Sequence, residues 1–117
     1  MTAQDTTLIA QLPLLINRLV EVLRTEAEAL RANPMADLSL YVEQKSRYHY
    51  EINLALANVD QRAIDPELSA IFRGLKEAVE HNVRALQAAR GASEDVVAML
   101  SREHRASTTD GTYSRYV

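Results

Sequence analysis

The chain has 117 residues, enough for one domain, and its 47% hydrophobic and 25% charged content is that of a globular protein. It contains no Cys, which excludes a disulfide framework and a Cys-ligated metal site. The net charge is −3 and no basic face stands out, so nucleic-acid binding has little electrostatic support.

Membrane and secretion signals are missing from the sequence. No apolar run approaches the ~20 residues of a membrane span. Residues 1–5 lack the basic region that opens a signal peptide. We therefore expect a cytoplasmic protein with no membrane insertion.

The first predicted helix runs from about Thr6 to Ala32. Its apolar residues recur at three- and four-residue steps, which is the spacing of an amphipathic helix: Leu8, Leu12, Leu15, Leu19, Leu23, Ala27 and Leu30. Pro13 removes a backbone hydrogen bond inside this stretch. Either the helix kinks at Pro13 or it begins there. Because the spacing keeps its phase across Pro13, we favour a kinked helix.

The second predicted helix runs from about Pro34 to Val59, because Asn33-Pro34 places a capping residue before a Pro at the first helical position. One face carries Leu38, Val42, Lys45, His49, Ile52, Leu56 and Val59, flanked by Tyr41, Tyr48 and Ala55. Tyrosines combine apolar area with a hydroxyl group, as interfaces often do. The tyrosines on this helix are predicted either to pack at the edge of the core or to contact a partner.

The third predicted helix begins at Pro66, where Asp65-Pro66 repeats the same start signal. Apolar residues keep the helical period from Leu68 to Leu100. Gly91 costs only ~1 kcal/mol in a helix, so we favour one continuous helix to about His104. The alternative is a break at Gly91, with Ser93 capping a fourth short helix.

These elements predict an all-α fold, an elongated antiparallel three-helix bundle with coiled-coil-like packing and a long third helix. The bundle is expected to comprise residues 1–105. From Ala106 the sequence is polar and has no apolar stripe, so residues 106–117 are expected to form a mobile tail.

Two polar residues stand on apolar stripes. Lys45 either reaches solvent with its ammonium group while its stem packs, or pairs with an acid on a neighbouring helix such as Glu21 or Glu80. A third interpretation is that the apolar stripe around Lys45 is incompletely buried and binds a partner. Asn82 is interpreted as a residue that fixes the register of the bundle.

The sequence offers little that predicts catalysis, a metal site or a cofactor. Neither a His-Glu-x-x-His motif nor a phosphate-binding loop occurs. The fragment that begins His81-Asn82-Val83-Arg84-Ala85 is a degraded version of the His-phosphotransfer pattern, in which Lys and Gly follow at the third and fourth positions. A solvated His beside the core is the simpler interpretation, so we expect no enzyme.

The order of these features resembles the FlgN-type flagellar export chaperones. The resemblance is carried by an acidic, Leu-rich first helix (Glu21 to Leu30), Lys45 on the second helix, Asn82 within the run Leu75 to Leu86, the stretch Val96-Val97-Ala98-Met99-Leu100, and a tail with Gly111 and Tyr113. The chain departs from the family in its tail, where the Gly precedes the Tyr.

The resemblance implies a chaperone that binds the terminal helical segments of hook-associated proteins and delivers them to the export gate. A generic helical adaptor or oligomerisation module, and less favourably a His-phosphotransfer domain using His81, are the alternatives. A homo-oligomer is compatible both with the export chaperone and with the adaptor or oligomerisation module. The predicted partner-binding residues are Leu86, Ala89, Val96, Val97, Met99 and Leu100, with Tyr113 as the anchor of a separate contact by the tail.

Overall fold

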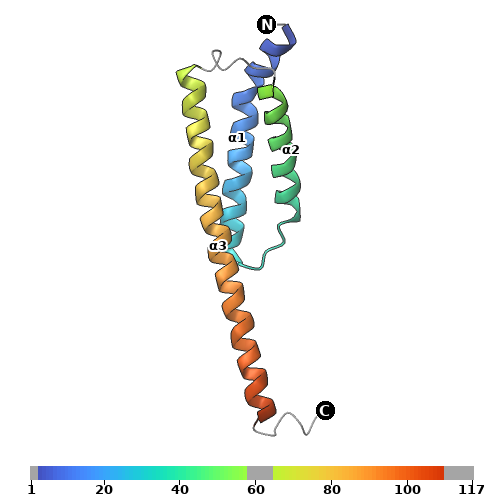
Figure 1. Cartoon of the computed structure of the whole chain (residues 1–117), viewed down its shortest axis with the longest axis vertical. Helices are drawn as coiled ribbons and strands as arrows, with labels where there is room; N and C mark the ends of the chain where they lie inside the picture. Colours follow the sequence, from blue (N-terminus) through green and yellow to red (C-terminus); the bar gives the residue numbers. More distant parts are fainter. Residues whose placement is uncertain (1–2, 58–64, 110–117) are drawn as a thin grey trace.

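The computed structural model confirms the all-α three-helix bundle. It describes residues 3–57 and 65–109, and side-chain environments from residue 10 to 57 and 65 to 106. Three helices follow in order: α1 (Ala3–Ala32), α2 (Ser39–Ala57) and α3 (Pro66–Thr109). The molecule is a rod of 76 × 23 × 20 Å. Helices α1 and α3 run in the same direction, and α2 runs in the opposite direction (Figure 1).

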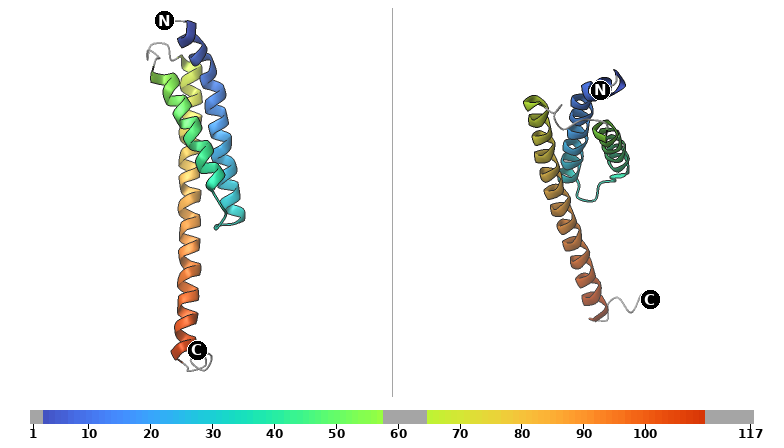
Figure 2. Two further views of the ribbon diagram at one scale, coloured as in Figure 1. Left: turned by 90° about the vertical axis from the view of Figure 1, so that its right-hand side faces the viewer. Right: turned by 45° about the horizontal axis from the view of Figure 1, so that its top comes forward.

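Helix α1 continues through Pro13, as favoured from the sequence. Its first turns are bent away from the axis of the rest of the helix (Figures 1 and 2). The missing N–H and the ring of Pro13 account for such a bend. From Leu12 onward, residues spaced alternately by four and three are buried, as in a coiled-coil seam: Leu12, Ile16, Leu19, Leu23, Glu26 and Leu30.

Helix α2 begins at Ser39, five residues after the predicted start, so the prediction from Asn33-Pro34 was wrong. The Asn33 side chain instead accepts a hydrogen bond from the Met35 amide (3.0 Å), which forms a turn directly after α1. Asp37 is the residue that orders the start of α2, because its Oδ1 accepts bonds from both the amide and the hydroxyl of Ser39. Two capping residues thus compete in this loop, and the second one begins the helix.

Helix α3 begins where Asp65-Pro66 predicts. Asp65 Oδ1 accepts a hydrogen bond from the Leu68 amide at 2.8 Å, which satisfies one of the free amides of the first turn. The helix then runs without a break through Gly91, so no separate fourth helix forms. It ends at Thr109 and includes the first four residues of the expected tail. Residues 110–117, with Tyr113, lie outside the described part of the chain.

The bundle is open, because the backbone of α1 lies close to both other helices while the backbones of α2 and α3 are further apart. Among the described residues, no Cα atom of α2 lies within 8 Å of one in α3. In the view of Figure 1, α1 lies between α2 and α3. The core is one cluster centred on α1, to which α2 contributes Tyr48, Ile52 and Ala55 and α3 contributes Leu68.

The open arrangement corrects the predicted face of α2. Tyr48 and Ala55, predicted as flanking residues, are buried against α1. Val42 and His49, predicted on the central stripe, are exposed. The apolar surface of α2 is wider than one neighbouring helix covers, since Leu40, Val42 and Leu54 are exposed.

Candidate functional site

Helix α3 extends far beyond the rest of the bundle. Figures 1 and 2 show its C-terminal half alone past the loop that joins α1 and α2. We call residues 90–109 the projecting segment. At 1.5 Å per residue its twenty residues are about 30 Å long. No other described helix lies against it.

The projecting segment continues the apolar face that packs on α1. Asn82, Ala89 and Val96 are seven residues apart and share one line of the helix. Asn82 and Ala89 are 3% and 7% exposed, whereas Val96 is 42% exposed. Since α1 ends at Ala32, the helix loses its cover while its sequence pattern stays the same. The result is an exposed stripe of Val96, Val97, Met99 and Leu100.

The structure separates the predicted partner-binding residues into two groups. Val96, Val97, Met99 and Leu100 are exposed together on the projecting segment. Ala89 is buried and Leu86 half-buried, so these two belong to the packed end of the bundle. Tyr113 lies outside the described residues.

A polar layer crosses the bundle where the seams of the three helices meet. Glu26 Oε1 accepts hydrogen bonds from Lys45 Nζ and from Asn82 Nδ2, both at 2.8 Å. Asn82 Nδ2 also donates to the carbonyl of Leu23 at 2.9 Å. Each helix contributes one residue to this layer. Asn82 is buried and bonded to α1, and its role in fixing the register stays a prediction.

Glu26 is the member of the layer that sequence reasoning missed. It is fully buried, and among the described residues its Oε2 has no hydrogen-bond partner. It is also the acid that pairs with Lys45, in place of the suggested Glu21 or Glu80. The available signal was its spacing, because Glu26 lies three residues after Leu23 and four before Leu30, which places it in the buried stripe.

A groove follows from the separation of α2 and α3. Its floor is Leu19 and Leu23 of α1, and its walls are Lys45, Ser46 and His49 of α2 and Val79 of α3. The wall formed by α3 is apolar and continues along Val83. The wall formed by α2 offers hydrogen-bonding groups. We call this surface the α2–α3 groove.

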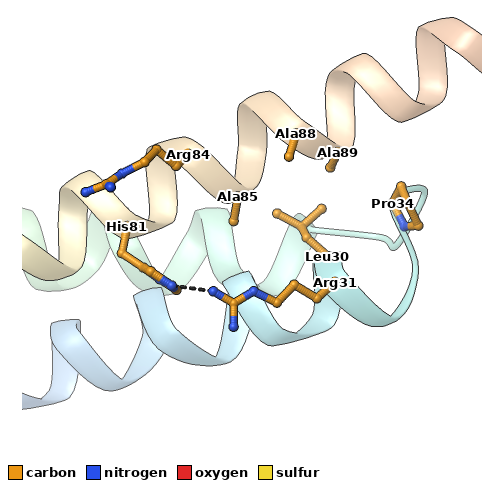
Figure 3. A pocket seen from close by; sticks show the side chains of 8 residues that line it. All are labelled: Leu30, Arg31, Pro34, His81, Arg84, Ala85, Ala88 and Ala89. Atoms are coloured by element: carbon orange, nitrogen blue, oxygen red, sulfur yellow. Dashed lines mark hydrogen bonds between the residues drawn. The ribbon is translucent and has the colours of Figure 1, made fainter.

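A second cleft lies on the other side of α3, at the end of the bundle. Leu30, Pro34 and a run of alanines form its apolar lining, with Arg31, His81 and Arg84 at its edge (Figure 3). The Arg31 guanidinium donates a hydrogen bond to Nε2 of His81. This contact between α1 and α3 therefore engages a ring nitrogen that a phosphotransfer histidine could use to accept a phosphoryl group.

Within the described ranges, no three His, Cys, Asp or Glu side chains are grouped closely enough to hold a metal ion. A search of the same residues finds no helix with the length and apolar character needed to cross a membrane. Comparison of the chain with models of known protein families, with curated proteins and with solved structures finds no match.

Proposed function

We propose that this protein is a helix-binding chaperone whose projecting segment holds an amphipathic helix of a partner protein. The observation that supports this function is the exposed stripe, which keeps the phase of the core face beyond the end of α1. An amphipathic partner helix would lay its own apolar face along such a stripe. Met99 adds a flexible side chain that adapts to irregular partner surfaces.

The resemblance to FlgN-type chaperones specifies the partner. It points to the terminal helical segments of hook-associated proteins, which would be held before secretion and then delivered to the export gate. Such segments are disordered until they assemble, so ordering them on the chaperone costs free energy. Binding is therefore expected to be moderate in affinity and reversible without any chemical step.

The test is binding of a hook-associated terminal segment to the variant Val97→Glu/Leu100→Glu. Two carboxylates in the exposed stripe should reduce affinity by more than tenfold, because burying an unpaired charge against an apolar helix is costly. The matched control is Ala98→Glu/Arg102→Gln, which changes the net charge by the same −2 on the opposite, polar side of the segment.

The measurement is isothermal titration of the segment into each variant, with circular dichroism to follow folding. The stripe variant should lose binding and, in dilute solution where self-association does not contribute to stability, keep the helical signal and melting temperature of the wild type. Global unfolding of the stripe variant would make these residues part of the core and contradict the proposal. Equal loss of binding in the control would show that charge alone, and not the stripe, determines the affinity.

A further inference from the structure

Two surfaces of this chain are uncovered. The first is the projecting segment, which is about 30 Å long. The second is the α2–α3 groove, whose wall on α2 consists of Lys45, Ser46 and His49. The arrangement is that of a four-helix bundle from which one helix is missing, since Cα atoms of α2 and of α3 come within 8 Å of α1 but, among the described residues, not of each other. The projecting segment is an amphipathic helix without a neighbour.

We propose that a second copy of this chain covers both surfaces. In the resulting twofold dimer the projecting segment of each copy lies antiparallel to α3 of the other copy, within its α2–α3 groove. Each end of the dimer then contains four helices, three from one copy and the projecting segment of the second. The arrangement is closed, because the same two surfaces are used once by each copy.

The phase of α3 supports this pairing. Val83, Arg90 and Val97 are seven residues apart and lie on one line along the groove side of the helix. A twofold axis near Arg90 places Val83 of one copy opposite Val97 of the second, and the reverse. Val83 and Val97 are 43% and 59% exposed, so both gain cover.

The charges at the axis are compatible with the contact. Arg90 Nε donates to Glu94 Oε1 at 2.9 Å, one turn further along the projecting segment. Two Arg90–Glu94 pairs therefore meet at the axis, and each cation has a carboxylate within reach on its own helix. Two unpaired arginines would repel each other at this point, whereas two ion pairs do not.

The area of the contact suits a reversible dimer. A helix about 30 Å long and 10 Å wide seated in a groove buries roughly 300 Å² on each surface, so two seatings bury roughly 1,200 Å² in total, above the ~1,000 Å² expected of a specific interface. Interfaces at this lower end of the size range are typical of weak, reversible complexes. A partner helix bound to the exposed stripe would compete with this dimer, but the dimer itself needs no partner.

The absence of Cys from the sequence allows a direct test by disulfide mapping of the purified full-length chain. Arg90→Cys should form a covalent dimer on mild oxidation, because the axis brings the two copies of this position together. Ala88→Cys is the matched control, since it is exposed, two residues away and on the opposite side of α3. It should remain a monomer in denaturing gels.

A second pair of variants retains Arg90. Val83→Cys mixed with Val97→Cys should give a mixed disulfide dimer, whereas Val83→Cys alone should give none, because its two copies would be about 21 Å apart along the helix. Light scattering of the unmodified chain at about 100 µM should give twice the monomer mass of 13.1 kDa. A monomer mass at that concentration, self-linking of Val97→Cys without the mixed product, or equal linking of Ala88→Cys and Arg90→Cys would each overturn the proposal.

Discussion

Replacement of Lys45 by Met tests the polar layer, because it keeps the apolar stem of the side chain and removes only the ammonium group. In the wild type this group donates to Glu26 Oε1 at 2.8 Å, and the Glu26 side chain is fully buried while that of Lys45 is 26% exposed. The variant leaves a buried carboxylate whose remaining donor is Asn82. Its second oxygen already lacks a partner among the described residues.

Removing one partner of a buried ion pair costs about 3–5 kcal/mol. Water that reaches the partly exposed Lys45 site reduces this cost, so we expect a loss of about 2–4 kcal/mol in the free energy of unfolding. The loss is large beside a total stability of about 5–15 kcal/mol. In a chain of this size it lowers the melting temperature by on the order of 10–20 °C. The result differs from the small effect that a solvent-directed lysine would show.

Urea unfolding at fixed protein concentration measures this loss, with Lys76→Met as the matched control. Lys76 is exposed on α3, and its replacement should change stability by less than about 0.5 kcal/mol. The double variant Lys45→Met/Glu26→Met should recover most of the loss, because an apolar pair of similar volume often replaces a buried ion pair without cost. If Lys45→Met is no more harmful than Lys76→Met, the reasoning about Glu26 is refuted.

Two further changes test local features of the helices. Gly91→Ala should slow amide exchange in residues 92–104 by about fivefold, because Gly costs ~1 kcal/mol in a helix and an added Cβ meets no atom within 4 Å. Unchanged exchange would show that Gly91 does not limit the helicity of the projecting segment. The Ser39 hydroxyl, followed by its amide, holds the pKa of Asp37 below its usual value near 3.8, so the ionised carboxylate stabilises the start of α2. This contribution to stability is present above the ordinary pKa of Asp37 and disappears as the pH falls through the lower pKa of the folded state. The melting temperature of Asp37→Ala should therefore lie below that of the wild type at pH 6 and approach it below about pH 4. A difference that stays constant with pH would contradict the role of the charge.

The sequence by itself determined the number of helices, their period and two of their features. Apolar residues that recur every three or four positions predicted each helix, because this spacing places their side chains on one face of a helix with 3.6 residues per turn. Asp65-Pro66 predicted the start of α3, since the cap and the Pro act on the first turn alone. The continuity of α3 through Gly91 also followed from local propensity and unbroken phase.

The tertiary structure alone decided which parts of those faces are covered. Whether Val42 or Tyr48 is buried on α2 depends on where α1 lies, and the apolar surface of α2 is wide enough for either side. The start of α2 depends on how far the loop must reach before the second helix can return along the first, so Asp37 rather than Asn33 begins it.

The same limit applies to the candidate site. Glu26, Lys45 and Asn82 each occupy a seam position that the sequence shows, but only the axial alignment of three helices brings them into one layer. The exposed stripe arises because α1 ends at Ala32 while α3 continues to Thr109. Periodicity encodes the face of a helix that is apolar, whereas its cover depends on the lengths and relative positions of its neighbours, which are set by packing between residues far apart in the sequence.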